Sequence, residues 1–324
     1  MTELYPFTFQ PILKERIWGG RLLETDYQKP LPPRDPIGES WEITDRTEGV
    51  SVIENGPLAG RDLRWLVENH AAALLGQSHP SSGRFPLLVK IIDAREKLSL
   101  QVHPSPESAQ QFGGELKTEL WYVAKAKPGA LLYAGLKRGA TRQEFESAIR
   151  DGTVANCFHR LPVRAGDALF LPSGRMHAIG EGIVIFEIQQ NSDTTYRVFD
   201  WNRVDAKGRP RELHIPQSLL SIDFTDFEPA LVSPEFTGER VRSRLLAASP
   251  PFETREWQME PRNGTTLNFE SALVLAVMDG HIELKSGNTT LTRRSGQFCL
   301  VPASCGTATI TTSEGASLLT STAA

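Results

Sequence analysis

The chain has 324 residues, with 35 lysine and arginine residues against 39 aspartate and glutamate residues, which gives a formal net charge of −4. This length allows two domains, each with its own hydrophobic core. The basic residues form no block that would follow a phosphate backbone, so the composition argues against a nucleic-acid partner.

The amino-terminal segment lacks the features of an export signal. Its first residues contain no basic stretch followed by an apolar one, and no apolar run in the chain reaches the length of a membrane span. The three cysteines, Cys157, Cys299 and Cys305, have no C-x-x-C spacing, which disfavours a disulfide framework and a cysteine zinc site. We therefore expect a soluble cytoplasmic protein without a membrane partner. No sequence feature indicates its oligomeric state.

Local signals predict three helices. Residues 62–75 have helical apolar spacing and are followed by Gly76, a typical helix end. Residues 105–113 begin with Ser-Pro, which places proline at the first helical position, and end at a glycine. Residues 141–152 begin with a Thr-x-x-Glu capping box. The second of these helices would carry the chain away from a sheet and back to it.

Strand-like segments dominate the rest of the chain. They are short, rich in β-branched and aromatic residues, and bounded by Gly, Pro, Ser and Asp, which is the pattern of an antiparallel sandwich or barrel. The clearest segments lie at 85–93, 97–102, 119–124, 168–172, 182–190, 194–201 and 272–278. We predict a mainly β protein with a few inserted helices.

A domain boundary is predicted near residue 232. The segment 227–236 holds Pro229 and Pro234 and shows no clear periodicity. We therefore expect a first domain over residues 1–232 and a second over residues 233–324.

Four residues of the first domain form a metal-ligand pattern, namely Gln101, His103, Glu119 and His177. Side chains two apart on a strand point to the same face with α-carbons ~6.6 Å apart, so Gln101 and His103 can converge on one ion. An isolated Gln-x-His pair would more often form hydrogen bonds in a polar strand. Because a glutamate follows, and then a histidine that ends a Gly-x5-Pro-x-Gly-x2-His segment, metal coordination is the favoured interpretation.

The second domain holds a damaged copy of the histidine segment. Gly296 and Pro302 repeat the spacing of Gly166 and Pro172, but no histidine follows. The preceding strand lacks a Gln-x-His pair with a glutamate after it, and His281 stands alone behind an Asp-Gly turn. The repeat predicts two related β-sandwich domains with one metal site.

The metal pattern and its surroundings resemble the cupin superfamily and, within it, the type I mannose-6-phosphate isomerase family, especially the short bacterial form. The matching pieces cover most of the first domain: GESWEI at 38–43, FPLLVKIIDA at 85–94, LSLQVHP at 98–104, KTELWYV at 117–123, and the stretch from MHAIGEG to DTTYRVFDW at 176–201. Leu116 departs from the family, which more often has glycine there. The resemblance implies two cupin-type β-sandwich or jelly-roll domains, the second of them degenerate and without a metal.

The resemblance also implies a zinc-dependent aldose–ketose isomerase. It would interconvert mannose 6-phosphate and fructose 6-phosphate through a cis-enediol or enediolate, so its partner is a small sugar phosphate. One Zn²⁺ per chain would be held by the four ligands named above. Three neutral ligands and one carboxylate leave such an ion with roughly one positive charge, which suits the stabilisation of an oxyanion.

A catalytic role for Arg197, twenty residues after His177, follows from the same resemblance. Arginine stays protonated and donates hydrogen bonds in a planar fork, so we expect it to steer ring opening and stabilise the enediolate, and not to accept a proton. The proton acceptor is open among Glu187, Asp193, Lys117 and a metal-bound water, whose pKa the ion would lower to ~7.

Substrate contacts are expected from Lys90, Lys117 and Trp18. The two lysines match family lysines and would add positive potential for a phosphorylated substrate, although a lysine on a strand is ordinarily solvated. Trp18 and Trp41 lie in fragments that resemble the family's and are expected to line the sugar pocket, with burial in the core as the alternative. His214, near a turn, is interpreted as structural.

Two other classes of function compete with the isomerase. A cupin dioxygenase would use iron held by three histidines and a carboxylate, or by a facial triad, and Gln101 disfavours both. A non-catalytic sugar-binding cupin is disfavoured because the ligands, Arg197 and Lys117 are all present. An isomerase of another sugar or sugar phosphate is the nearest alternative and stays open.

Overall fold

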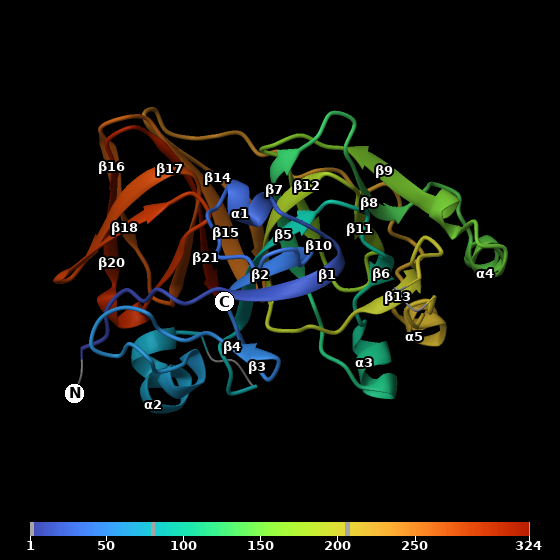
Figure 1. Ribbon diagram of the computed structural model, residues 1–324, viewed down its shortest axis with the longest axis horizontal. Helices are drawn as coiled ribbons and strands as arrows, with labels where there is room; N and C mark the ends of the chain where they lie inside the picture. The colour runs from blue at the N-terminus through green and yellow to red at the C-terminus, as the bar shows by residue number, and fades with distance from the viewer. Residues whose placement is uncertain (1–2, 79–81, 205–207, 324) are drawn as a thin grey trace.

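The structure is a computed structural model that describes residues 3–78, 82–204 and 208–323. In this part of the chain, strands β1 to β21 form three large sheets and one small hairpin, and five α-helices are placed around them (Figure 1). This arrangement confirms the expected mainly β architecture with a few inserted helices.

Two antiparallel sheets that pack face to face are built from strands between residues 12 and 199, a part of the chain that we call the first half. The larger has the order β1–β2–β5–β12–β7–β10, with strands Ile12–Gly20, Ile37–Ile43, Leu87–Ala94, Ile183–Gln190, Glu119–Ala126 and Ala168–Leu171. The smaller has the order β13–β6–β11–β8–β9, with strands Tyr196–Phe199, Leu100–Val102, His177–Ile179, Leu131–Leu136 and Phe158–Pro162. We call this pair of sheets the first sandwich.

Side-chain alternation along the strands decides what lies inside the first sandwich. In β5, Ile91 packs on the outer face of the six-stranded sheet, and Ile92 packs between the two sheets. Because the side-chain period of a strand is two, Lys90 shares the inner face with Ile92. The same rule in β7 and β12 turns Glu119 and Glu187 inward, among apolar neighbours.

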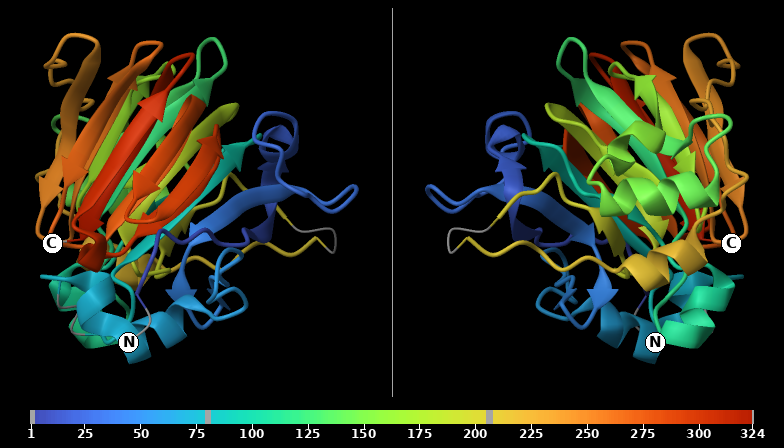
Figure 2. Two further views of the ribbon diagram at one scale, coloured as in Figure 1. Left: turned by 90° about the vertical axis from the view of Figure 1, so that its left-hand side faces the viewer. Right: turned by 90° about the vertical axis from the view of Figure 1, so that its right-hand side faces the viewer.

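The C-terminal part of the chain forms an eight-stranded sheet. Its path is β14–β15–β21–β17–β20–β16, with strands Val241–Ser249, Phe252–Met259, Ala316–Ala323, Leu273–Ser286, Thr307–Thr312 and Asn263–Asn268. Two further strands pair with β17, namely β18 (Thr289–Arg294) and β19 (Phe298–Val301). In Figure 2 the orange and red strands of this sheet run alongside the green strands of the first half. We call this folded sheet the second sandwich. The residues in its interior form a separate apolar cluster.

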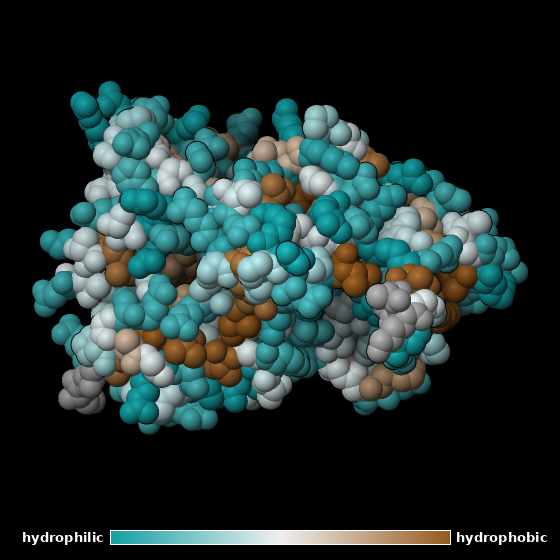
Figure 3. Space-filling model, viewed as in Figure 1, coloured by the Kyte–Doolittle hydropathy of each residue, from teal (hydrophilic) through white to brown (hydrophobic). Residues whose placement is uncertain are grey.

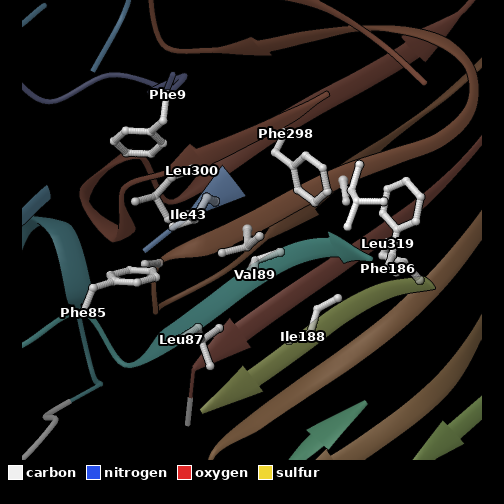
Figure 4. Close-up of a cluster of buried hydrophobic side chains, with 14 of the residues drawn as sticks. Phe9, Ile43, Phe85, Leu87, Val89, Phe186, Ile188, Phe298, Leu300 and Leu319 are labelled. Carbon is white, nitrogen blue, oxygen red and sulfur yellow. The ribbon is translucent and has the colours of Figure 1, made fainter. Parts of the chain in front are cut away.

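One large core joins the two halves. Phe186 of β12 stacks on Phe298 of β19 with ring centroids 5.6 Å apart, and Leu319 of β21 lies in the same cluster (Figure 4). The N-terminal segment also crosses over, because Phe7 and Leu300 exchange backbone hydrogen bonds of 2.8 and 2.9 Å. The domain boundary near residue 232 stays a prediction, since the halves share this core.

The three helices predicted from local signals are all present: α2 (Leu63–Leu75), α3 (Pro106–Phe112) and α4 (Arg142–Arg150), the last with the expected capping box. Two further short helices were not predicted, α1 (Leu22–Thr25) and α5 (Ile215–Ser221). The remaining small elements are β3 (Asp45–Arg46), β4 (Gly49–Val50) and the 3-10 turns Val154–Cys157 and Ala303–Cys305. None of the helices in the described ranges has the length and apolar character needed to cross a membrane.

Candidate metal centre and active-site pocket

His103, Glu119 and His177 come together inside the first sandwich. Glu119 begins β7, His177 begins β11, and His103 directly follows β6. All three are fully buried, and their ligand atoms lie within 4.8 Å of one another. Gln101 joins them, because it is the register partner of His177 across the β6–β11 pair. The two sheets thus bring together the four predicted ligands from three separate parts of the chain.

The spacing of the ligand atoms suits a small divalent ion. Oε1 of Glu119 lies 3.4 Å from Nε2 of His103 and 3.4 Å from Nε2 of His177. The amide nitrogen of Gln101 lies 3.2 Å from Nε2 of His177. In a tetrahedral zinc site with bonds of about 2.0 Å, neighbouring ligand atoms are about 3.3 Å apart. The side chains therefore need little movement to surround one ion.

Backbone carbonyls set the tautomer of both histidines. Nδ1 of His103 lies 3.0 Å from the carbonyl oxygen of Thr194, and Nδ1 of His177 lies 2.9 Å from that of Arg175. A carbonyl oxygen can only accept, so each Nδ1 carries the proton and donates it. This leaves a lone pair on each Nε2, which faces the Glu119 carboxylate and is available to a metal.

The Gln101 amide needs a half-turn before its oxygen can reach a metal. Its nitrogen faces His177, while its oxygen accepts a hydrogen bond of 3.4 Å from the Ser99 hydroxyl. The oxygen and nitrogen of an amide have similar sizes, so rotation exchanges them without new clashes. The Ser99 hydroxyl can then accept from the amide nitrogen, because a hydroxyl both donates and accepts.

Burial and charge keep the ligands in the protonation states that a metal needs. Burial, with the nearby Lys117 ammonium, lowers the pKa of His103 to about 4, and burial lowers the pKa of His177 as well. Burial alone would raise the pKa of Glu119, but Lys117 and the imidazoles hold it well below its usual value. Within the described residues, Oε1 of Glu119 and Nε2 of His103 have no hydrogen-bond partner, and a cation would satisfy both.

A pocket of about 360 Å³ adjoins the ligands through Gln101. Its volume is at the lower end of the range for small-molecule sites. The remaining predicted site residues all line it: Trp18, Lys90, Lys117, Glu187, Asp193 and Arg197. The structure therefore gathers the predicted residues around one candidate metal centre and one pocket.

Charged side chains of alternating sign line the wall of this pocket. Nζ of Lys117 lies 2.9 Å from Oε2 of Glu119 and 3.8 Å from Oε1 of Glu187. Nζ of Lys90 lies 2.9 Å from the same Glu187 oxygen, and the Trp121 indole donates to the other one at 2.7 Å. Burial opposes the charge of Lys90, but the neighbouring carboxylates raise its pKa above the usual value. Both lysines are buried, so neither is a solvated strand lysine.

The wall also includes Arg16, Glu39 and Arg211, which the sequence did not predict. Glu39 accepts hydrogen bonds of 3.0 and 3.1 Å from the Arg16 guanidinium and one of 2.7 Å from the Trp41 indole. Burial would raise the pKa of Glu39, but Lys90 and Arg16 lower it to about 2. The available signal was the pair of glutamates, Glu39 and Glu42, in the short strand-like stretch GESWEI.

Arg197 lies on β13 opposite Gln101. Its Nη1 donates to the backbone oxygen of Glu212 at 2.8 Å, and its backbone N–H donates to Nδ1 of His214 at 3.1 Å. His214 is structural, as interpreted, but its contact is with a predicted catalytic residue. In the described ranges the buried Nε of Arg197 has no hydrogen-bond partner, so the guanidinium retains a donor for a ligand.

The two tryptophans differ in position although both are buried. Trp18 is 3% exposed and lines the pocket. It is therefore both buried and part of the pocket, the two positions that the sequence left open. Trp41 is 1% exposed and contacts the pocket wall through Glu39. Outside the first sandwich, His281 lies 3.6 Å from the exposed Glu314 and contacts the Ser313 hydroxyl, as expected for a surface histidine.

Comparison with known proteins gives similarity along almost the whole chain. The family described as phosphomannose isomerase type I, catalytic domain, matches residues 7–138. The mannose-6-phosphate isomerase of Streptococcus mutans is 38% identical over 301 residues, which cover 92% of this chain and 92% of that protein. The crystal structure of the Bacillus subtilis mannose 6-phosphate isomerase superposes with a TM-score of 0.89 at 30% identity, covering 98% of this chain and 99% of that one. A mannose 6-phosphate isomerase bound with zinc and yttrium has a TM-score of 0.76 at 15% identity and 98% coverage of this chain (99% of that one), a likeness of fold alone.

Proposed function

Since this chain belongs to the type I phosphomannose isomerase family and acts as a mannose-6-phosphate isomerase, we propose that its reaction takes place at the centre formed by Gln101, His103, Glu119 and His177. The reaction interconverts an aldose, mannose 6-phosphate, and a ketose, fructose 6-phosphate. The fold, with two cupin-type sandwiches, is that of the family. The convergence of three fully buried ligand side chains carries this placement, since atoms of His103 and Glu119 have no hydrogen-bond partner among the described residues.

We assign one zinc ion per chain to the centre. The 3.4 Å distances from Glu119 Oε1 to Nε2 of both histidines support zinc, and so does the zinc-bound relative with the same fold. When bound, the ion would supply Lewis-acid polarisation of the sugar carbonyl and stabilise negative charge on oxygen during proton transfer.

The pocket wall positions the phosphorylated sugar. Lys90 and Lys117 give a positive potential, although each also pairs with a carboxylate. The partly buried Arg197 keeps a free Nε donor, which we direct at the oxygens of the opened sugar. Trp18 offers a flat apolar surface for the carbon skeleton. In this arrangement arginine stabilises the enediolate by donating hydrogen bonds and does not move a proton.

We place proton transfer between the two reacting carbons on Asp193. Three carboxylates that are not metal ligands line the pocket, and two of them are engaged: Glu39 by Arg16, and Glu187 by Lys90. Such contacts stabilise the charged form of a carboxylate and weaken it as a base. Asp193 makes no hydrogen bond or ion pair with the described residues, and Lys90 acts on it only through space and more weakly than on Glu187 and Glu39, so we assign it the proton transfer from C2 to C1.

Proton exchange distinguishes the two carboxylates. Asp193→Asn should abolish exchange of the C2 hydrogen of mannose 6-phosphate with deuterated water, while its zinc content stays at one ion per chain. Glu187→Gln, the matched control, should slow turnover but keep the exchange, because it disturbs two lysines and leaves the base. Exchange at the original rate in the Asp193 variant would move the proton acceptor elsewhere.

A coupled assay tests the function as a whole. Purified protein should convert mannose 6-phosphate to fructose 6-phosphate, lose activity after chelation, and regain it when zinc is restored, with manganese, cobalt and iron in parallel. Arms with mannose and with other sugar phosphates test the nearest alternative. Higher kcat/KM on any of those sugars would overturn the assigned substrate, and full activity after complete metal removal would overturn the assigned centre.

We place the enzyme in the cytoplasm. All three cysteines are free thiols, as a reducing compartment maintains them. Fractionation of cells that produce the protein, with activity followed in each fraction, checks this placement.

A further inference from the structure

A second cavity, of about 880 Å³, lies between the two halves of the molecule. Residues 26–30 and Glu42 form one wall, and residues 292–298 of the C-terminal sheet form the opposite one. Figure 3 shows the surface hollowed between the C-terminal sheet and the α1–β2 region. The lining residues differ from those of the metal-centre pocket throughout the described chain, so this is a separate space.

One wall holds a buried ammonium group that is paired with a buried carboxylate. The side chain of Lys29 is 8% exposed, and its Nζ lies 2.7 Å from the Glu42 carboxylate, which is 4% exposed. Glu42 also accepts a hydrogen bond of 2.6 Å from the Ser40 hydroxyl. An ammonium group has three N–H donors, and Nζ of Lys29 lies 2.7 Å from each oxygen of Glu42 and 5.8 Å from the centre of the Phe298 ring. One N–H therefore remains for a ligand that brings an oxygen atom.

The opposite wall supplies two guanidinium groups. The buried Nε of Arg293 has no hydrogen-bond partner within the described ranges, and its Nη1 reaches Glu54 only at 4.0 Å. Arg294 is exposed, and its side chain forms no ion pair with any described residue. Guanidinium groups bind carboxylates and phosphates in a two-pronged manner. Arg293 and Arg294 therefore lie across the cavity from the paired Lys29, and the carboxylates of Asp26, Glu42, Glu54 and Glu314 also line it.

Aromatic rings form an apolar surface beside these cations. Tyr27 and Phe298 line the cavity and are each 6% exposed. Small-molecule sites typically combine such apolar surface with a few fixed polar groups. The carbon skeleton of a ligand can pack on the rings while an anionic group reaches Lys29 and Arg293.

The same rings pack against the strand that separates the cavity from the metal-centre pocket. Phe186 stacks on Phe298 at 5.6 Å and meets Tyr27 edge-on at 5.7 Å between ring centroids. The next residue along β12 is Glu187, which lines the metal-centre pocket. A ligand that fixes Tyr27 and Phe298 thus acts on the strand that carries Glu187.

We propose that this cavity is an effector site that binds a small metabolite carrying a phosphate or a carboxylate group. The oxyanion accepts hydrogen bonds from Lys29, Arg293 and Arg294, and the rest of the molecule packs on Tyr27 and Phe298. Binding itself is independent of catalysis, whereas the effector role rests on the proposed isomerase function.

Calorimetric titration of the zinc-loaded protein tests the binding. The probes are inorganic phosphate, glycerol 2-phosphate and tartrate, and a larger affinity for the phosphates or for tartrate identifies the anionic group. Arg294→Gln, at an exposed position that should not affect folding, and Arg293→Gln should each weaken binding at least about tenfold. Arg197→Ala, in the other pocket, should bind the probes at the cavity as the original protein does.

The outcomes separate the two pockets. No heat with any probe, or binding lost in Arg197→Ala and kept in Arg293→Gln and Arg294→Gln, would overturn the cavity site. For the effector role, a saturating probe should change kcat/KM in the original protein by a factor that Arg294→Gln removes. Competitive inhibition that persists unchanged in Arg294→Gln belongs to the substrate pocket and contradicts the effector role. Since calorimetry needs no turnover, failure of the isomerase assay would leave the binding test intact.

Discussion

The two sandwiches have related architecture, but the interior of the first holds buried charged residues and that of the second is apolar. Inside the first, the inward positions of β7 and β12 carry Glu119 and Glu187, which are buried. Inside the second, the inward positions hold residues such as Leu275, Leu284 and Ile310, each fully buried in an apolar cluster. Strand alternation fixes which positions face inward, and the residues at those positions determine whether the interior is a site or a core.

This difference assigns stability and chemistry to different parts of the molecule. Buried charges lower the stability of the fold unless they are paired, whereas buried apolar side chains raise it. The apolar outer face of the six-stranded sheet packs on the C-terminal sheet through contacts such as Phe186 with Phe298. The C-terminal sheet thus forms a shared apolar core with the sheet that carries the buried charges on its other face.

The largest expected effect comes from His103→Ala. It should remove metal and activity together, with kcat/KM falling by about 10³-fold or more, because several kcal/mol of Lewis-acid stabilisation are lost. Metal content by mass spectrometry of the native protein and the coupled assay measure both. His281→Ala, in the C-terminal half, is the matched control and should change neither quantity.

Arg197→Ala should separate metal binding from turnover. The variant is expected to keep its zinc and to lose about 10²–10³-fold in kcat, because the free Nε donor lies in the pocket and not among the ligands. Metal analysis and steady-state kinetics check this. A near-normal kcat in this variant would remove the arginine from the mechanism.

Leu275→Ala should produce the reverse result in the second sandwich. Deleting a fully buried leucine side chain lowers the free energy of unfolding by about 2–5 kcal/mol, whereas kcat of the folded fraction should stay within twofold or so. Urea unfolding and an assay at low temperature measure the two quantities. An equal loss of stability in His103→Ala, with unchanged activity in both, would contradict the assignment of chemistry to the first interior.

The smallest effect is expected for Gln101→Glu. A second carboxylate ligand should retain the metal but reduce the positive charge of the centre, which weakens oxyanion stabilisation and lowers kcat by about tenfold. Equal or higher activity would contradict the charge argument. Gln101→Ala serves as the control, since it removes the ligand and should also weaken metal binding.

Some parts of the structure followed from local sequence and others did not. Caps and glycines located α2, α3 and α4, because those signals act within a few residues. The helices α1 and α5 were missed, since both are short and neither has a side-chain cap. Arg16 and Glu39 were missed for another reason: each looks like an ordinary strand charge until the pocket brings them together.

The sequence by itself determined which residue types are available for a metal, and the strand period determined that Gln101 and His103 share a face. Only the tertiary structure decided that these two meet Glu119 from the other sheet and His177 from a neighbouring strand. It also decided that Lys29 and Arg293 border one cavity. The physical reason is range: alternation and caps depend on adjacent residues, whereas strand pairing and sheet packing depend on burial of the whole apolar surface at once.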